Sequence, residues 1–155
     1  MGYVIFHHSG ELNEVQDAFM RIARSRLCAN SVCQHACIQA LNGPQDHIEE
    51  VNRKLRERRD FSYKRLNEIE GISTAKPDGA FYIFPKIEAM EKGLWPDDKA
   101  FVLDLLREAH VLVVHGSGFC TTYGKGHFRA VILPPLDTLK KAFDKIEQFM
   151  KKRLK

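Results

Sequence analysis

The stretch GKGHFRAVILPP, residues 124–135, joins a glycine-bearing loop, an apolar strand and a proline stop, and it places an arginine inside the strand. Val131, Ile132 and Leu133 are typical of a strand packed on both faces. An unpaired guanidinium is costly there, so Arg129 requires a partner. The sequence around Arg129 is compatible with two kinds of partner. One is an internal Asp or Glu in a structural ion pair, and the other is an external carboxylate held by two parallel hydrogen bonds.

The residues after Gly71 alternate strand and helix patterns. We predict that ISTA and AFYIF form two strands joined by a turn, because Lys76-Pro77-Asp78-Gly79 has the order that turns require. The elements expected after Gly71 are strand 72–75, strand 80–84, loop 88–96, a helix capped by Asp97 or Asp98, strand 111–114, glycine loop 116–126, strand 128–133 and a helix after Pro134-Pro135. This order predicts an α+β two-layer sandwich with its helices on one face of the sheet.

The first seventy residues are predicted to be mainly helical. YVIF at 3–6 indicates a short strand, and the apolar spacing over 12–27 is that of an amphipathic helix. A second helix over 31–41 is stopped by Asn42-Gly43-Pro44. A long helix over 45–69 has a narrow apolar stripe and a charged middle, so we expect it to lie across a surface or to join two bodies.

Composition excludes several classes of protein. The net charge of +4 is spread among acidic residues, without a basic stripe, which does not favour strong nucleic-acid binding. The longest apolar runs are far too short to cross a bilayer, so no membrane span is expected. MGYVIFHHS lacks the features of a signal peptide. We therefore expect a cytoplasmic protein.

Cysteines and histidines give no clear metal or nucleophile signature. Cys28, Cys33, Cys37 and Cys120 lack paired CxxC spacing, which favours simple thiols over a metal site. His115 and His127 flank the glycine loop and could be combined with Cys120 as metal ligands or as a Cys–His pair. Because no third orienting group has a diagnostic spacing, we favour histidines without catalytic duty and expect no metal.

Two further patterns offer competing functions. GSGFCTTYGKG (116–126) could cradle a phosphate, but its glycine spacing matches neither known phosphate loop, and a strand follows it. KGHFRAVI (125–132) is loosely like an RNA-binding strand, yet it lacks aromatic residues at alternate positions. A stand-alone α+β module that binds nucleic acid or an acidic protein is therefore the alternative function.

Two longer stretches carry a specific resemblance. PDGAFYIFPKI (77–87) and HGSGFCTTYGKGHFRAVILPP (115–135) resemble the C-terminal part of the class I, fold-type-I pyridoxal-phosphate-dependent aminotransferases. The shared features are a GAFY-x-FP strand, a GSGF loop and a G-x-G-x-[FY]-R motif. Gly2-Tyr3 resembles the end of the family's GWRxGY segment, so the resemblance covers the whole chain. Among the branches of the family it is closest to the alanine aminotransferases.

The resemblance implies a role for Arg129. In the family, the arginine of G-x-G-x-[FY]-R binds the α-carboxylate of the amino-acid substrate, and Gly79 and Phe81 would line the same cleft. The implied substrates are an amino acid, such as alanine, and a 2-oxo acid, and the implied assembly is a homodimer. Residues 1–43 would be a remnant of the large cofactor domain, 44–70 the connecting helix and 71–155 the C-terminal small domain.

The resemblance also implies what this chain does not carry. The family's Schiff-base lysine and most ligands of pyridoxal phosphate belong to a segment upstream of GWRxGY. We therefore expect no catalytic and no cofactor-binding residue here, no bound pyridoxal phosphate, and no transamination by the isolated chain. The apolar stripe of helix 12–27 and the strand at 3–6 would have lost their large-domain partners, so we expect self-association or mobility there.

Overall fold

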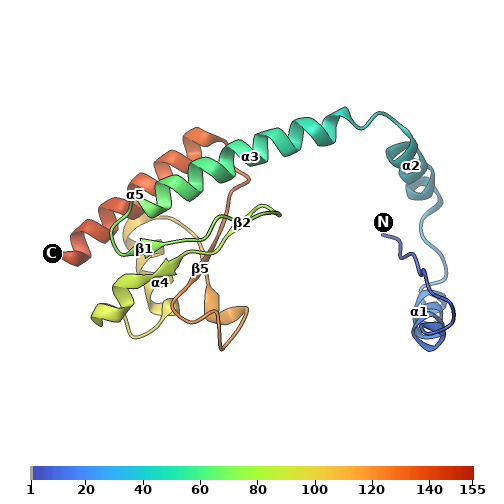
Figure 1. The fold of residues 1–155 in the computed structure, drawn as a ribbon, viewed down its shortest axis with the longest axis horizontal. Coiled ribbons are helices and arrows are strands. Elements are labelled where there is room, and N and C mark those ends of the chain that lie inside the picture. The colour runs from blue at the N-terminus through green and yellow to red at the C-terminus, as the bar shows by residue number, and fades with distance from the viewer. Residues whose placement is uncertain (1) are drawn as a thin grey trace. The chain divides into compact units, whose positions relative to one another are not determined.

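The computed structural model describes residues 2–155, which divide by their contacts into a unit ending at His47 and a unit from Ile48 to Lys155. The elements in chain order are α1 (Asn13–Ser25), α2 (Ser31–Asn42), α3 (Asp46–Asn67), β1 (Ile72–Ser73), β2 (Tyr82–Ile83), β3 (Lys86–Ile87), the 3-10 helix η1 (Glu88–Lys92), α4 (Asp98–Ala109), β4 (Val114–His115), the 3-10 helix η2 (Gly116–Gly118), β5 (Phe128–Val131) and α5 (Leu136–Leu154) (Figure 1). Within residues 2–155, no helix combines the length and apolar character needed to span a membrane.

The first unit contains the two helices expected from its sequence. α1 and α2 begin and end within two residues of the predicted bounds. The side chain of Asn30 caps α2 by accepting a hydrogen bond from the backbone N–H of Cys33 at 3.3 Å. The strand predicted at 3–6 is wrong, because these residues form no strand. A strand needs a neighbour for its backbone groups, and the described strands all pair with other segments.

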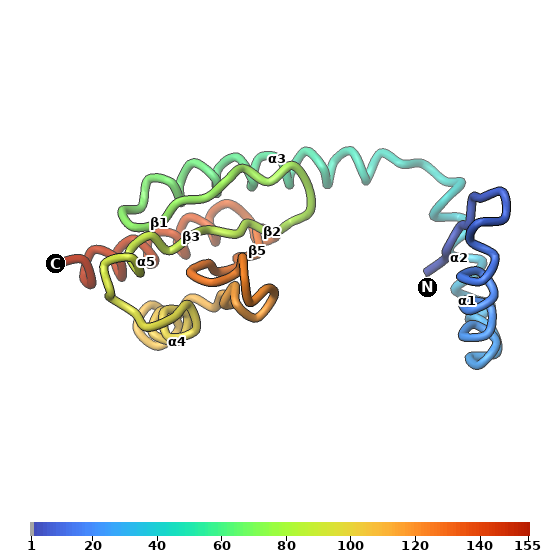
Figure 2. Tube along the Cα trace, turned by 60° about the horizontal axis from the view of Figure 1, so that its bottom comes forward, coloured from blue at the N-terminus to red at the C-terminus, as the bar shows by residue number. Residues whose placement is uncertain are grey.

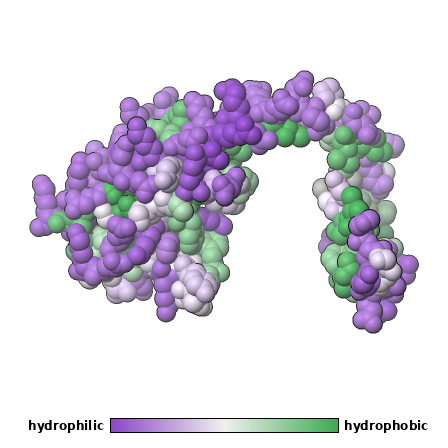
Figure 3. Space-filling view, viewed as in Figure 1, coloured by the Kyte–Doolittle hydropathy of each residue, from purple (hydrophilic) through white to green (hydrophobic). Residues whose placement is uncertain are grey.

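The first unit does not enclose a core of its own. No residue of α1 or α2 is buried. On α1, Phe19 is 47% exposed and Ile22 is 68% exposed, although the rings of Phe6 and Phe19 make an edge-to-face contact at 5.4 Å. Apolar side chains are accordingly visible on the surface of this unit (Figure 3). A helix stripe of this kind normally packs against another element.

α3 confirms the long helix predicted over 45–69, and its C-terminal half belongs to the core of the second unit. Ser62 and Leu66 of α3 are buried, and this half runs beside α5 in both views (Figures 1 and 2). Arg65 bridges the two helices, since its guanidinium donates to Asp144 at 2.8 Å and also to Glu147. An arginine in the last turn of α3 thus joins this helix to α5.

The main sheet of the second unit has the strand order β2-β5-β4, with both pairs antiparallel. In the register, Ile83 pairs with Ala130 and Val114 pairs with Arg129. Side chains alternate along β5, so Phe128 and Ala130 are buried whereas Arg129 and Val131 lie on the other face. This alternation separates the core of the unit from the face that presents Arg129.

The predicted pairing of ISTA with AFYIF is wrong. β1 pairs with β3 rather than with β2, with Ile72 opposite Ile87. The side chain of Asn67 accepts a hydrogen bond from the Thr74 N–H at 3.0 Å and donates to the Thr74 carbonyl at 3.2 Å. Because these bonds remove Thr74 from any ladder, the following residues form a wide loop instead of a tight hairpin turn.

Other boundaries differ in smaller ways. The loop expected at 88–96 contains the 3-10 helix η1. The strand expected at 111–114 pairs only at Val114 and His115, because α4 ends in a left-handed His110 (φ 55°) and the chain reaches β5 only afterwards. The predicted helix cap is confirmed, since the Asp97 side chain accepts a hydrogen bond from the Ala100 N–H at 2.7 Å.

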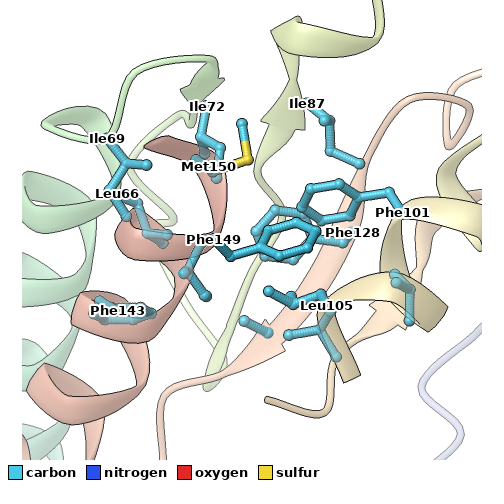
Figure 4. Close-up of a cluster of buried hydrophobic side chains, with 14 of the residues drawn as sticks. Leu66, Ile69, Ile72, Ile87, Phe101, Leu105, Phe128, Phe143, Phe149 and Met150 are labelled. Atoms are coloured by element: carbon cyan, nitrogen blue, oxygen red, sulfur yellow. The ribbon is translucent and has the colours of Figure 1, made fainter. Parts of the chain in front are cut away.

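Aromatic rings fill the core between the sheet and its helices. The ring centre of Phe101 in α4 lies 5.6 Å from that of Phe128 in β5 and 5.8 Å from that of Phe149 in α5 (Figure 4). Trp95 adds a further ring, centred 5.0 Å from that of Phe101. Since α4 and α5 both place rings on the buried face of β5, they cover the same face of the sheet. The predicted α+β two-layer sandwich is confirmed.

Candidate functional site

Arg129 projects from β5 on the face opposite the aromatic core. Its guanidinium carbon lies 4.4 Å from the centre of the Tyr82 ring and 4.0 Å from the centre of the Phe119 ring. Tyr82 comes from the neighbouring strand β2, and Phe119 follows η2 in the glycine loop. Two rings next to one guanidinium restrain its plane and favour its charge through cation–π attraction.

The guanidinium has no acidic partner within residues 2–155. Its Nε atom is buried and makes no hydrogen bond. None of the ion pairs formed in the described part of the chain includes Arg129. The structural ion pair that the sequence left open is therefore not made by these residues. An arginine held without a counter-charge is a suitable receptor for a planar anion.

The glycine loop is closed by its own backbone. The N–H groups of Phe119 and Cys120 donate to the carbonyl of Gly116 at 2.9 and 3.3 Å, and the N–H of Gly124 donates to the carbonyl of Cys120 at 2.9 Å. A Cβ atom added at Gly116 or Gly124 would collide with the backbone of the other, which explains both glycines. Because these three amides donate within the loop, they are not available to a phosphate, which does not favour the phosphate cradle weighed from the sequence.

Asp98 anchors the start of this loop. Its carboxylate accepts a hydrogen bond from the Ser117 N–H at 2.7 Å, and its side chain is almost fully buried. Nδ1 of His115 lies 3.0 Å from the Ser117 hydroxyl and 4.0 Å from the Asp98 carboxylate. A Ser-His-Asp triad needs the serine and the aspartate on different ring nitrogens. Because both groups approach Nδ1, this cluster is not a nucleophilic triad.

Cys120 and His127 do not form the catalytic pair that was considered. Backbone N–H groups, first that of Tyr123 at 3.3 Å and next that of Thr122, lower the pKa of the exposed Cys120 thiol. The ring of His127 instead stacks on Phe84 at 5.3 Å. Within residues 2–155, no three potential ligands of the His, Cys, Asp or Glu types gather in one place.

The structure also constrains the RNA-binding alternative. Phe128, the aromatic residue of the KGHFRAVI pattern, is fully buried in the core. Base recognition on a sheet requires exposed rings on which bases stack. Phe128 therefore does not supply such a platform.

Gly79 and Phe81 lie before β2, on the segment that leads to Tyr82. Gly79 is exposed and Phe81 is partly buried, and both line a hollow of about 300 Å³ together with Asn52 and Arg56 of α3. The Phe81 ring lies 4.5 Å from the Tyr82 ring, which in turn contacts Arg129. Phe81 is thus connected to Arg129 through Tyr82, whereas Arg129 does not line the hollow that Gly79 and Phe81 share.

A second hollow, of about 490 Å³, lies between the β4–β5 edge and α5. Its lining includes Leu112, Val114 and Val131, which are all exposed apolar residues, and it also includes Arg129. Lys141 and Lys145 of α5 lie at the same hollow. It is an apolar surface beside the sheet and does not contain a cluster of buried polar groups.

Three residues at the site were missed in the sequence. Tyr82 and Phe119 were not distinguished as partners of Arg129, and Asp98 was considered only as a possible helix cap. For Phe119 and Tyr82, the available signal was an aromatic residue in each motif that surrounds the arginine. For Asp98, the signal was a second aspartate directly after the capping residue, where one carboxylate is sufficient for the helix.

The lysines of the chain indicate whether it fits covalent attachment of a pyridoxal phosphate cofactor. A lysine that forms a Schiff base with a carbonyl cofactor is normally activated by burial or by a neighbouring cation. Every lysine from Lys54 to Lys155 is exposed. The residues of this chain therefore do not fit covalent attachment of that cofactor, and no step of the chemistry is assigned to them.

Comparisons with known proteins agree on one family. Residues 1–146 match the family model described as aminotransferase class I and II. The glutamate-pyruvate aminotransferase AlaA of Haemophilus influenzae is 42% identical over 131 residues, which are 83% of this chain and 32% of that protein. The solved alanine aminotransferase from Pyrococcus furiosus is 59% identical with a TM-score of 0.86, over 93% of this chain and 36% of that one.

A solved aminotransferase from Escherichia coli is similar as well, with a TM-score of 0.83 and 35% identity over 96% of this chain and 37% of that one. The present chain spans about a third of the length of the relatives that it matches. The residues matched by the family model include parts of both units and the strand β5 that carries Arg129.

Proposed function

The chain belongs to the class I and II aminotransferase family, and we propose that it forms the C-terminal, substrate-binding part of an enzyme that transfers the amino group between L-alanine and a 2-oxo acid. The observation that carries this proposal is the guanidinium of Arg129, which contacts the rings of Tyr82 and Phe119 and has no carboxylate partner within residues 2–155. The choice of alanine is supported by the names of the relatives from Haemophilus influenzae and Pyrococcus furiosus.

Arg129 would bind the α-carboxylate of the substrate. A guanidinium presents N–H donors in a fork that matches the two oxygens of a carboxylate. Tyr82 and Phe119 restrict the rotation of this fork, so the bound amino acid has a defined orientation. Orientation of this kind is a large part of what an enzyme contributes to a reaction. Gly79 and Phe81 would line the same cleft, which the small domain closes as a lid.

We assign the domains as the resemblance implies. Residues 1–43 belong to the large domain, 44–70 form the connecting helix, and 71–155 form the small domain. The exposed stripe on α1 supports this division, because the first unit by itself buries no residue of that helix. Contact with further polypeptide, or with a second copy in a homodimer, would cover it.

Members of the family use pyridoxal phosphate, which carries the chemistry of amino-group transfer. Because all lysines of this chain are exposed, we propose that the cofactor-binding lysine belongs to polypeptide outside these residues. The 155-residue chain alone would then neither bind pyridoxal phosphate covalently nor transaminate. What it contributes is the carboxylate site and the closing domain.

The experiment that tests this function is a graft. Residues 2–155 replace the matching segment of the Pyrococcus furiosus alanine aminotransferase, and transamination between L-alanine and 2-oxoglutarate is measured. We expect the grafted enzyme to be active and the isolated chain to be inactive. In parallel, pyridoxal phosphate and borohydride are added to the isolated chain, and lysine adducts are sought by mass spectrometry. A folded but inactive graft, or a stoichiometric adduct on one lysine of the chain alone, would contradict the proposal.

A further inference from the structure

Asp98 is a buried carboxylate with few partners. It is the first residue of α4, and only 2% of its surface is exposed. No lysine or arginine forms an ion pair with it in the described part of the chain, and Nδ1 of His115 lies 4.0 Å from its carboxylate. Burial of an ionised carboxylate is costly unless hydrogen bonds compensate. The short hydrogen bond from the Ser117 N–H, at 2.7 Å, is therefore the main compensation.

Asp97 shows that the helix cap does not require Asp98. The Asp97 side chain accepts the hydrogen bond from the Ala100 N–H and caps α4, and this residue is exposed. Asp98 instead reaches a loop that is distant in sequence. The two adjacent aspartates thus serve different elements, one the helix and the other the glycine loop.

Short contacts connect Asp98 to Arg129. Ser117 lies in the 3-10 turn η2. The turn is closed by a backbone hydrogen bond from the Phe119 N–H to the Gly116 carbonyl at 2.9 Å, which fixes the backbone of Phe119. The ring of Phe119 then contacts the guanidinium of Arg129 at 4.0 Å. The hydroxyl of Ser117 makes an additional contact with His115 at 3.0 Å. A shift of Ser117 would consequently move the ring that holds the arginine.

We infer that Asp98 is a positioning residue for the carboxylate site: by binding the Ser117 amide it sets the turn that places the Phe119 ring against Arg129. The inference rests on the proposed function only where it names a substrate carboxylate as the ligand. Asp98 contacts neither the substrate nor Arg129, so its effect is exerted through the loop. A carboxylamide at this position retains an oxygen acceptor, whereas a methyl group does not.

The test uses the Nε–H signal of Arg129 in the NMR spectrum of the 155-residue chain. Because the guanidinium lies over two aromatic rings, we expect this signal upfield of those of arginines without a neighbouring ring. We expect Asp98→Ala to return the signal towards the unstacked position and Asp98→Asn to leave it near its original place. Asp97→Ala is the matched control, which weakens the cap of α4 without moving the signal. An Arg129 signal that is unchanged in a folded Asp98→Ala variant would overturn the inference.

A second measurement does not depend on the folding of a variant. In the unmodified chain, the Ser117 amide should exchange slowly with solvent, because its acceptor is buried. Exchange at the rate of an unprotected amide would overturn the inference, whatever becomes of Asp98→Ala.

The grafted enzyme separates this inference from the proposed function. There, Asp98→Ala should lower kcat/KM for L-alanine by about tenfold to a hundredfold, as a misplaced positioning group does, and Asp98→Asn should recover most of it. If the graft with the natural residue is inactive while the Arg129 signal responds as expected, the proposed function fails and the positioning role stands. An active graft whose kcat/KM is unaffected by Asp98→Ala would remove the positioning role alone.

Discussion

Replacement of Arg129 by methionine separates a binding role from a structural one. Arg129→Met removes cation–π contacts with Tyr82 and Phe119, each worth about 0.5–1 kcal/mol when partly exposed. It also removes a buried Nε donor without a partner, and such a group costs about 1–3 kcal/mol. The unbranched methionine keeps most of the contact made by the arginine stem. These effects oppose each other, so the free energy of unfolding should fall by no more than about 1 kcal/mol.

Arg65→Met is the matched control. Arg65 donates to Asp144 at 2.8 Å and to Glu147, and its side chain is only 16% exposed. Hydrogen bonds to charged groups contribute about 1.5–3 kcal/mol, so this substitution should destabilise the chain by about that amount. The two variants exchange the same residue types and differ in whether the guanidinium has protein partners.

Urea unfolding followed by the fluorescence of Trp95 measures both variants. Trp95 is the only tryptophan, and it lies within the aromatic core of the second unit. The reasoning is refuted if Arg129→Met destabilises the chain as much as Arg65→Met does. That result would show that Arg129 stabilises the fold. Removal of one partner of a buried ion pair has such an effect and costs about 3–5 kcal/mol.

Three further predictions concern the loop, an ion pair and the surface of α1. Gly116→Ala should cost about 1–3 kcal/mol in urea unfolding, because a Cβ there collides with backbone, and an unchanged midpoint would contradict the loop geometry. A hydrogen bond from Arg59 and then one from Lys76 lower the pKa of Asp60 to about 2. The stability that this carboxylate contributes is therefore present above about pH 4 and is lost as the pH falls towards 2. Asp60→Asn should make the urea midpoint of unfolding less dependent on pH over that window. Phe19→Glu should abolish self-association of the chain in sedimentation experiments, and unchanged association would place the contact elsewhere.

The helices were predictable because their signals are local. The apolar spacing and the stop at Asn42-Gly43-Pro44 lie within each segment, and α1, α2 and α3 follow the predicted bounds within two residues. The sheet was less predictable because strand pairing depends on distant residues. Asn67 takes Thr74 out of the expected hairpin, a contact that no pattern within ISTA reveals.

The candidate site shows the same limit. Arg129 was identifiable from the sequence because a charge interrupts an apolar run. Its surroundings were not, because Tyr82 and Phe119 meet it only when β2 and the glycine loop are folded against β5. Likewise, the sequence left Asp97 and Asp98 as equivalent caps, and only the fold shows that Asp98 reaches Ser117.

The most direct test of the carboxylate site is kcat/KM for L-alanine in the grafted enzyme with and without Arg129→Met. Loss of a desolvated charge pair costs about 2–5 kcal/mol, and about 1.4 kcal/mol corresponds to a factor of ten. We predict a fall of about 30-fold or more, with the cofactor still bound and the stability of the enzyme retained. A value within about threefold of that of the unsubstituted graft would contradict the assignment of Arg129 as the receptor of the substrate carboxylate.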